Sequence, residues 1–491
     1  MKRISALLIF LLIFSLIGCE GTPSCQITGA HTDENSDTIC DLCSISVLVE
    51  FDFFAINDLH GKFDDTSTNE GVDELTTYIK LQEKQNDNVV LISQGDMWQG
   101  SSESNLTNGF IITEWMNELD FVSMTLGNHE YDWGEEKIRE NLEIAEFPFL
   151  AINVYSKDTH TRVDYAAPSV MIEEDGIKIG IIGAMGDCYS SISREMTEGI
   201  YFKTGDELTA LVKSESIRLR NAGADFIIYS IHDGYSSSSS HYDYSLSQGY
   251  VDLVLEGHTH QRYINEDKHG VYHVQSGGEN EGISHIEVKF NTVSGKVHVK
   301  KPEFVSTSVY QNLGDSPVVD ALLEKYGDEI AKADVPLGYN ASKRDSRFIT
   351  DLIAKLYTEW GVSEYGEEFD IVLGGGYLKL RSPYYLYAGE VKYSDVQSIL
   401  PFDNALTLCS IKGRDLKSKF IYSDNSSYRV YYTEYGKSVK NNIDEDATYY
   451  VIVDTYTATY APNRLTIVKR FDEGFYARDL LAEYIKSGGL K

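Results

Sequence analysis

The segment Gly127-Asn128-His129-Glu130-Tyr131-Asp132-Trp133-Gly134 follows directly on an apolar run at residues 121–126. The apolar run predicts a buried strand, and the glycine after it favours a sharp turn because glycine tolerates positive φ. Such a turn carries polar side chains to the rim of a sheet. Asn128 is then a candidate metal ligand, and His129 is expected to face a substrate. The alternative is that these polar residues only cap a helix that begins near Glu135.

Asp132 stands three residues after His129. In a turn, this spacing lets the carboxylate accept a hydrogen bond from one ring nitrogen, which fixes the tautomer and favours the protonated ring. We therefore expect His129 and Asp132 to form a catalytic pair in which the histidine is an oriented acid.

Four further polar motifs stand where predicted strands end. They are Asp58-Leu59-His60 after residues 47–56, Gly95-Asp96 after 89–92, His232 after 226–231, and Gly257-His258-Thr259-His260 after 251–255. Alternate side chains of an extended segment share one face, so Asp-x-His and His-x-His can each chelate one ion or span two. Together with His129, these motifs hold five of the twelve histidines of the chain, which chance clustering does not explain.

The motifs together supply enough ligands for two divalent ions, with one carboxylate left to bridge them. The candidate ligands are Asp58, His60, Asp96, Asn128, His232, His258 and His260. Two neighbouring ions lower the pKa of a shared water and hold a phosphoryl group for in-line attack. The pattern therefore predicts a hydrolase of phosphate esters.

The order of these motifs resembles that of the calcineurin-like metallophosphoesterases. Gln-Gly-Asp-Met-Trp-Gln-Gly-Ser at 94–101, Asn-His-Glu-Tyr-Asp at 128–132 and Gln-Ser-Gly-Gly at 275–278 resemble the secreted branch, the 5′-nucleotidases and UDP-sugar hydrolases. The resemblance covers residues 51–290. It implies an α/β fold: a four-layer αββα metallophosphoesterase sandwich, followed by a second α/β domain of the 5′-nucleotidase C-terminal type.

The resemblance also implies a role for each motif residue. Asp58, His60 and His260 would hold one metal, Asn128, His232 and His258 the other, and Asp96 would bridge them. His129, oriented by Asp132, would stabilise the transferring phosphoryl group or help the leaving oxygen, and a metal-bound hydroxide would be the nucleophile. The metals of this branch are typically zinc, manganese or other first-row ions, and imidazole and carboxylate ligands fit that range without choosing among them.

The second half of the chain departs from the family pattern. The family's Asn-Gly-Gly-Gly-Ile-Arg is here Leu373-Gly374-Gly375-Gly376-Tyr377-Leu378, predicted as a glycine-rich turn, so the Asn is lost and the arginine is expected at Arg381. The upstream arginine that would contact the substrate phosphate is Arg344 or Arg347. After Tyr456, the family's Gly-Gly-Asp-Gly is replaced by Tyr460-Ala461-Pro462-Asn463.

Other substrate-binding positions are retained. Pro401-Phe402-Asp403-Asn404 matches the family's Pro-Phe-Gly-Asn turn, which makes Phe402 and Asn404 candidates for substrate binding, and Tyr456 stands where a second stacking aromatic is expected. An aromatic face stacks on any base with about 1–3 kcal/mol. Core packing is the alternative role for Phe402 and Tyr456.

Apolar periodicity divides the rest of the chain into two α/β regions joined by a helical linker. The expected boundaries are residues 46–305 for the metallophosphoesterase domain, 306–336 for the linker, with a helix over 317–333, and 337–491 for the substrate-binding domain. Predicted strands of the first domain are residues 47–56, 89–92, 121–126, 147–153, 177–182, 226–231, 251–255, 271–275 and 285–290, and its predicted helices are 72–85, 111–119, 135–144 and 207–222. The second domain is expected to contain helices at 348–360 and 477–486 and strands at 369–373, 405–411 and 448–456.

The chain begins with two positive charges and a short apolar run that ends in Leu16-Ile17-Gly18-Cys19. This arrangement is typical of a secretory signal, and the run is too short to span a bilayer comfortably. Its end resembles the bacterial lipobox, which implies a signal peptide at residues 1–18 and lipidation of Cys19. We expect a protein on the extracellular face of a bacterial membrane, held by the lipid anchor alone.

Cys25, His31, Cys40 and Cys43 form the spacing C-x5-H-x8-C-x2-C in a polar tether expected over residues 19–45. Such a set can hold one zinc ion as a second metal site. A flexible tether with incidental cysteines, or with one disulfide, is an equal alternative.

The formal net charge is −33, so nucleic acid is not an expected partner because polyanions need basic surfaces. An anionic substrate needs local positive charge, which bound metals supply. We expect removal of phosphate from nucleotides or related small compounds. The alternatives are a UDP-sugar diphosphatase, a 2′,3′-cyclic nucleotide phosphodiesterase, or a surface binding protein with a residual metal site.

Overall fold

The computed structural model describes residues 24–25, 30–64, 71–234, 242–378, 380–381, 383–421, 428–460, 464–471 and 474–491. The predicted signal peptide, Cys19 and residues 461–463 lie outside this part of the chain. Within it, none of the helices combines the length and the apolar character needed to cross a membrane. The chain forms two compact units, Met1–Glu50 with Lys289–His298, and Phe51–Val288 with Val299–Lys491.

The first half of the larger unit contains two sheets. One has the order β13-β1-β2-β3-β4 with β15 paired to β13, and the other has the order β11-β12-β10-β9-β7-β6. The first sheet contains β1 Leu48–Ile56, β2 Val89–Ser93, β3 Ser123–Thr125, β4 Phe149–Leu150, β13 Gly282–Asn291 and β15 Glu303–Ser306. The second sheet contains β6 Ser169–Glu174, β7 Ile177–Met185, β9 Phe226–His232, β10 Leu253–Glu256, β11 Arg262–Glu266 and β12 Tyr272–Ser276. The neighbours from β1 to β4, and β7, β9, β10 and β12, pair in parallel, so their carboxyl ends meet at one edge of each sheet.

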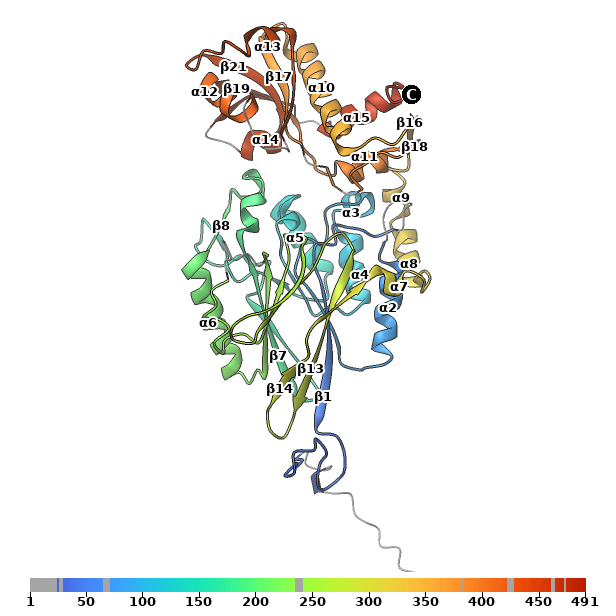
Figure 1. The fold of residues 1–491 in the computed structure, drawn as a ribbon, viewed down its shortest axis with the longest axis vertical. Coiled ribbons are helices and arrows are strands. Elements are labelled where there is room, and N and C mark those ends of the chain that lie inside the picture. The colour runs from blue at the N-terminus through green and yellow to red at the C-terminus, as the bar shows by residue number, and fades with distance from the viewer. Residues whose placement is uncertain are drawn as a thin grey trace, which may run out of the picture. The chain divides into compact units, whose positions relative to one another are not determined.

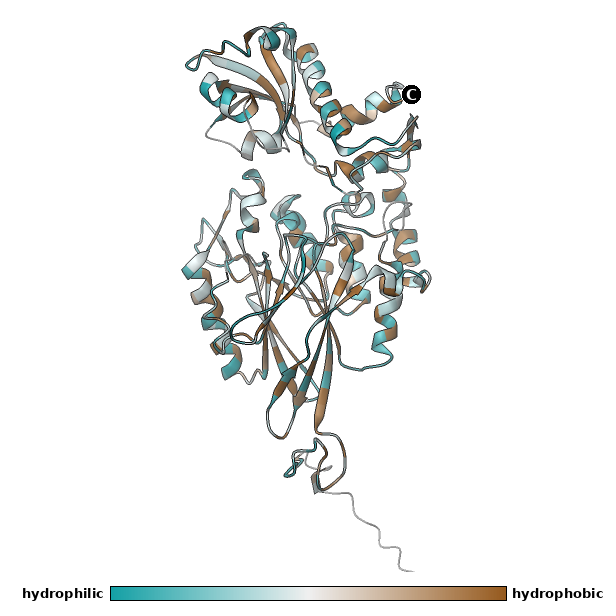
Figure 2. Ribbon diagram, in the orientation of Figure 1, coloured by the Kyte–Doolittle hydropathy of each residue, from teal (hydrophilic) through white to brown (hydrophobic). Residues whose placement is uncertain are grey.

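The two sheets pack face to face between layers of helices (Figure 1). The ring of Phe53 in β1 stacks on Phe226 in β9, and Thr125 Oγ1 in β3 lies 2.6 Å from Ser230 Oγ in β9. Helix α6 covers one outer face, and helices α2, α4 and α8 cover the other; they span α6 Gly205–Asn221, α2 Asp73–Glu83, α4 Phe110–Glu118 and α8 Pro317–Lys325. Figure 2 shows apolar residues concentrated along the strands between these layers. The α/β class expected from the sequence is confirmed.

Shorter elements complete this half. They are α3 Ser102–Leu106, the 3-10 turn η1 His129–Tyr131, α5 Gly134–Ile144, β5 Val154–Ser156, β8 Ile200–Phe202, β14 Val297–Val299 and α7 Thr307–Tyr310. The residue at the N-cap of α5 is Trp133, and no side chain caps this helix. Capping of α5 is therefore not the role of Asn128, His129 or Asp132.

The predicted linker helix is split into α8 and α9 Gly327–Ile330. The hydroxyl of Ser316 accepts a bond from Val318 N at the start of α8, next to Pro317, which is a favoured helix start. Val319 and Leu322 of α8 are buried in the first core, and Lys325 pairs with Glu114 of α4. The first part of the linker is thus fixed to the first domain.

The second half has its own core and a five-stranded sheet of order β20-β17-β21-β19-β22. Its strands are β17 Ile371–Tyr377, β19 Leu406–Lys412, β20 Tyr428–Tyr432, β21 Thr448–Asp454 and β22 Leu465–Arg470, with a separate pair β16 Pro336–Asn340 and β18 Gly389–Lys392. Its helices are α10 Ser346–Tyr365, α11 Tyr393–Ile399, α12 Gly413–Leu416, α13 Glu434–Val439, α14 Thr455–Tyr460 and α15 Ala477–Lys486. Helices α10 and α15 contribute Ile353, Tyr357 and Leu481 to this core.

The glycine-rich turn predicted at residues 374–376 is wrong, because these glycines continue strand β17. A Cβ on Gly374 would lie 2.5 Å from the backbone nitrogen of Thr358, and one on Gly375 would lie 2.1 Å from the carbonyl oxygen of Arg429. The glycines therefore allow α10 and β20 to approach the strand closely.

Glu130 joins the loops that follow β2 and β3. Its buried carboxylate accepts hydrogen bonds from three backbone N–H groups: those of Asp96 (2.9 Å) and Gly127 (2.7 Å) on Oε2, and that of Met97 (2.8 Å) on Oε1. Buried backbone donors need such partners. This one side chain fixes the distance between two loops that carry predicted metal ligands.

We predict that Glu130→Gln destabilises the protein by about 1–3 kcal/mol, because the amide turns one acceptor into an N–H group that faces a buried N–H donor. The expected result is a lower midpoint of thermal unfolding by calorimetry. Glu136→Gln is the matched control, since Glu136 lies on the surface of α5. Equal midpoints for the two variants would contradict the role given to Glu130.

Candidate active site and metal centre

The predicted ligands converge at the carboxyl ends of β1, β2, β9 and β10. Three groups of side chains have ligand atoms within 4.8 Å of one another: Asp58 with His60 and His260, His60 with Asp96 and His129, and Asp96 with His232 and His258. Asp96 and His60 each belong to two of these groups. The sequence motifs, which lie far apart in the chain, thus form one cluster.

Five of these ligand residues have left-handed backbone conformations. The φ angles are +52° at Asp58, +52° at His60, +53° at Asp96, +70° at His258 and +53° at His260. Non-glycine residues in this region cost about 1–3 kcal/mol each, and such strain persists only where the surrounding structure imposes it. Here the loops hold one another, because Asp58 N donates to Gly95 O (2.9 Å) and His60 N donates to Asp96 O (3.0 Å).

The turn expected at Gly127 has a different cause. Gly127 is not among the residues with positive φ. A Cβ at this position would lie 2.3 Å from Asp96 Oδ1 and 2.9 Å from His232 Cε1. Glycine is required here because the metal ligands approach the backbone, and not because the turn is left-handed.

Backbone carbonyls set the tautomers of two ligand histidines. His60 Nδ1 lies 2.9 Å from Gln99 O, and His232 Nδ1 lies 2.5 Å from Gln94 O. A carbonyl oxygen only accepts, so each Nδ1 carries the proton and each Nε2 is directed to the cluster. Burial and the neighbouring Arg381 also lower the pKa of His60 well below its usual range, which keeps this ring neutral.

The geometry of the cluster fits divalent cations. His60 Nε2 and His260 Nε2 lie 3.0 Å apart, and His232 Nε2 lies 3.0 Å from Asp96 Oδ2. The buried Asn128 Oδ1 has no hydrogen-bond partner in the described part of the chain. Lone pairs that face each other in a buried site need a cation between them. Burial alone would lower the pKa of the His232 ring. The carboxylates of Asp96 and Asp58 nevertheless raise this pKa to about 10, so a proton on His232 can balance their charge where a metal ion would otherwise do so.

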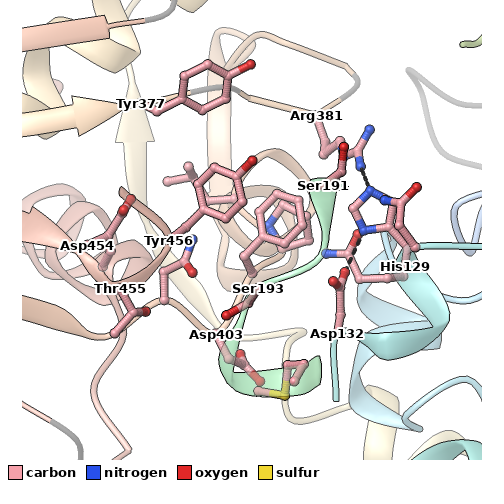
Figure 3. A pocket seen from close by; sticks show the side chains of 18 of the residues that line it. His129, Asp132, Ser191, Ser193, Tyr377, Arg381, Asp403, Asp454, Thr455 and Tyr456 are labelled. Carbon is pink, nitrogen blue, oxygen red and sulfur yellow. Dashed lines mark hydrogen bonds and ion pairs between the residues drawn. The ribbon is translucent and has the colours of Figure 1, made fainter. Parts of the chain in front are cut away.

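The two ring nitrogens of His129 contact a carboxylate and a guanidinium group. Asp132 Oδ2 lies 2.6 Å from His129 Nδ1, and Arg381 Nη2 lies 2.5 Å from His129 Nε2 (Figure 3). Because arginine only donates, Nε2 is the acceptor in this contact, and Nδ1 faces the Asp132 carboxylate. The pairing of His129 with Asp132 that the sequence predicts is present.

A cavity of about 410 Å³ opens beside the cluster and is lined from both halves of the larger unit. The first half contributes Asp96, Asn128, His129, Asp132, His258 and His260, and the second half contributes the predicted substrate-binding residues Arg381, Phe402, Asn404 and Tyr456. Phe402 and Tyr456 are partly exposed and belong to no buried core of the described chain, which argues against the core-packing alternative. Figure 3 shows Tyr456 and Tyr377 across the cavity from His129.

Arg347 does not reach this cavity. Its side chain is 82% exposed and its Nε lies 3.9 Å from Asp351 Oδ2 on the same helix, and Arg344, the other candidate, packs over the ring of Phe348. Both arginines stand at the start of α10, whose buried face points to the second core. The structure therefore brings one predicted arginine, Arg381, to the site and leaves Arg347 outside it.

Two arginines that line the cavity, Arg478 and Arg470, were not predicted from the sequence. Arg478 of α15 donates to the carbonyl oxygens of Pro401 (3.2 Å) and Phe402 (2.8 Å) and pairs with Asp403 at 2.5 Å, so it positions the loop that carries Phe402. Arg470 Nη1 lies 2.8 Å from Glu195 Oε2 and joins the two halves at the rim. The sequence could have indicated Arg478, because it lies in the first turn of an amphipathic helix. A positive charge is unfavourable at that end of a helix unless another group pairs with it.

Comparisons with known proteins show similarity to phosphoesterases and 5′-nucleotidases. Residues 51–262 match the calcineurin-like phosphoesterase family. The UshA protein of Yersinia enterocolitica is 24% identical over 465 residues, with 81% of this chain and 83% of UshA covered. The 5′-nucleotidase of Vibrio cholerae is 24% identical over 417 residues, with 73% of each chain covered.

A solved 5′-nucleotidase precursor from Thermus thermophilus has the same fold, with a TM-score of 0.70, 18% identity, and coverage of 89% of this chain and 96% of that one. The resemblance to this family stated from the motifs is confirmed. Residues 51–262 form a calcineurin-like phosphoesterase domain, and the chain is a metal-dependent phosphoester hydrolase with UshA and 5′-nucleotidases among its homologues.

Proposed function

We propose that the protein removes the 5′-phosphate from nucleotides at a dinuclear metal centre. The observation that carries this proposal is the shared cavity, in which the metal-ligand cluster, the His129–Arg381 contact and the aromatic rings of Phe402 and Tyr456 line one space of about 410 Å³. A nucleotide joins a phosphate to a nucleoside in one molecule. The cavity thus offers separate places for the two parts of a nucleotide.

Asp58, His60 and His260 would hold the first ion, and Asn128, His232 and His258 the second, with Asp96 between them. Imidazole, carboxylate and amide oxygen ligands suit zinc or manganese. Such an ion pair supplies an activated water and neutralises charge on the phosphoryl group. The chain's own contribution is to keep these ligands correctly directed through Gln94 O, Gln99 O and Glu130.

Arg381 marks the expected position of the substrate phosphate. Its guanidinium now donates to His129 Nε2, and a phosphoryl oxygen would be a stronger acceptor because it is charged. When Arg381 turns to the phosphate, His129 Nε2 is free to bind a proton, and Asp132 at 2.6 Å stabilises the charged ring. His129 would then donate that proton to the leaving oxygen of the ester.

Phe402 and Tyr456 would hold the base. The ring of Phe402 lies 5.7 Å from that of His129 and 5.6 Å from the Arg381 guanidinium, so the base would stack close to the phosphate. Tyr456 lies 5.8 Å from Tyr377, which extends the aromatic wall. Asn404 lines the same wall and offers an amide for base recognition.

We also propose export and lipid anchoring, which rest on the sequence Leu16-Ile17-Gly18-Cys19 outside the described residues. A diphosphatase of UDP-sugars or a cyclic phosphodiesterase would use the same metal ligands and would differ in substrate profile. A binding protein without catalysis is disfavoured by the preserved geometry of the ligand cluster and the His129–Asp132 pair.

We predict rapid release of phosphate from AMP and other 5′-nucleotides in the presence of Mn²⁺ or Zn²⁺. UDP-glucose, a 2′,3′-cyclic nucleotide and an aryl phosphate are the comparison substrates, and Asp96→Ala is expected to lower the rate at least about 100-fold because it removes the bridging ligand. If the aryl ester alone were hydrolysed, the phosphoesterase would stand and the nucleotide proposal would fall. Metal-loaded protein with no turnover of any substrate would support the binding-protein alternative.

Three single variants separate the roles assigned within the cavity. Arg381→Ala is expected to lower kcat/KM about 10–100-fold for AMP and for the aryl phosphate, since both carry the phosphate that Arg381 binds. Phe402→Ala is expected to lower it about 5–100-fold for AMP only. Arg347→Ala, at an exposed arginine outside the cavity, is the matched control. Equal losses on both substrates for Phe402→Ala would contradict base stacking.

A further inference from the structure

We infer that Cys25, His31, Cys40 and Cys43 bind one structural zinc ion, separate from the catalytic centre. The four residues belong to the smaller compact unit, and their ligand atoms all lie within 4.8 Å of one another. The proposed phosphohydrolase mechanism uses none of them. The inference therefore adds a metal site to the one already described.

The distances within the cluster match a tetrahedral zinc site. Cys25 Sγ and Cys40 Sγ lie 3.8 Å apart, and Cys43 Sγ lies 3.4 Å from His31 Nδ1. With Zn–S bonds of about 2.3 Å and Zn–N bonds of about 2.0–2.1 Å, tetrahedral geometry places two sulfurs about 3.8 Å apart and a sulfur and a nitrogen about 3.6 Å apart. A disulfide would need about 2.05 Å between sulfurs, so Cys25 and Cys40 are not joined in this structure.

The backbone directs the last two cysteines to the same side. Cys40 N donates to Ile45 O (2.8 Å), Ser44 N donates to Cys40 O (2.9 Å), and Ile39 pairs with Ser46 across the hairpin. Ser44 closes this tight turn with φ of +58°, a conformation that costs energy for a serine. Cys40 and Cys43 lie on the closed hairpin and face the other two ligands.

The loop from His31 to Cys40 is ordered by its own polar groups. The Asp33 carboxylate accepts bonds from Asp37 N (2.9 Å) and Thr38 N (3.1 Å), and Asp37 Oδ1 accepts one from Ile39 N (2.9 Å). Asp41 N also donates to Thr32 O (2.9 Å), next to the histidine. These bonds set the separation of His31 and Cys40 without a contribution from apolar packing.

The apolar core of this segment is too small to hold it together. In the described residues it consists of Cys25, Cys40 and Val47, with Cys43 packed against them, whereas the side chains of Leu42 and Ile45 are 56% and 47% exposed. Segments with so little buried apolar surface need a metal or a disulfide to stay folded. Since the thiols here are free and converge with an imidazole, a metal is the remaining means of stabilisation.

The ligand set also indicates the kind of metal site. Three thiolates and one imidazole satisfy all four positions of zinc and leave none for a substrate, which is typical of a structural site. Because a site of this kind is seldom formed in the unfolded chain, the free energy of metal binding contributes to folding. The ion would tie Cys25 to residues 31–43, which precede the catalytic domain in the sequence.

Cobalt substitution of the full-length protein under reducing conditions tests this inference. Thiolate ligands give Co²⁺ an intense near-ultraviolet charge-transfer absorption, which the sulfur-free ligands of the catalytic centre cannot produce. We expect this absorption in the parent protein and in Asp96→Asn. The double variant Cys40→Ser/Cys43→Ser should lose this absorption. It should also bind one zinc ion per chain fewer than the parent protein. Cys188→Ala/Cys409→Ala, which removes two buried cysteines outside the cluster, is the matched control and should retain both.

A second variant covers the case in which the serine substitutions unfold the segment. His31→Cys keeps four ligands and should bind Co²⁺ with stronger thiolate absorption. The inference is overturned if the parent protein shows no thiolate absorption, or if the absorption is unchanged in Cys40→Ser/Cys43→Ser. It is also overturned if the isolated protein carries a Cys25–Cys40 disulfide and binds no extra zinc after reduction. Because these readouts do not involve turnover, failure of the nucleotidase proposal would leave them unchanged.

Discussion

The three hydrogen bonds that the buried Glu130 carboxylate accepts set the distance between the loop of Asp96 and the loop of Asn128 and His129. Both loops follow strands of one parallel sheet, and a further hydrogen bond from His129 N to Asp96 Oδ1 (2.8 Å) also joins them. The close approach also explains Gly127, since any side chain there would overlap Asp96. Five candidate ligand residues also have left-handed backbone conformations, which cost free energy. Hydrogen bonds between the loops hold these conformations in place.

The second half of the chain lines the cavity with residues that differ from the family pattern. The asparagine of the family pattern is Leu373 here, buried in β17, and the glycines after it serve the packing of α10 and β20. Arg381, four residues beyond the strand, contacts His129, and Arg478 donates to the carbonyl oxygen of Phe402 and so holds its loop. The candidate metal ligands thus follow the family pattern, whereas the proposed substrate-binding residues depart from it.

The clustering of the candidate metal ligands and most strands could be predicted from the sequence, because each ligand motif directly follows an apolar run. Each strand predicted within residues 46–305 overlaps an observed one, and α15 has the predicted bounds. Edge strands such as β6 and β11 escape prediction, since they are half exposed and carry mixed polar residues. Strand β21 ends at Asp454, two residues before the predicted end, because the chain turns into helix α14 at Thr455.

The parts that could not be predicted depend on contacts between distant segments. The contact between His129 and Arg381 joins residues 252 positions apart, and no local pattern shows it. The positions of Arg344 and Arg347, which do not line the cavity, likewise became visible only with the position of α10. Glu130 stands within the quoted motif, yet its role became visible only when its three N–H donors were located on two loops.

The central claim is that one bridging carboxylate, Asp96, lies between two metal ions. Anomalous diffraction at the manganese edge from a crystal soaked in Mn²⁺ tests it most directly. The account predicts two peaks about 3.5–4 Å apart, one beside Asp58, His60 and His260, the other beside Asn128, His232 and His258, with Asp96 in contact with both. A single peak, or two peaks of which Asp96 touches only one, would contradict it.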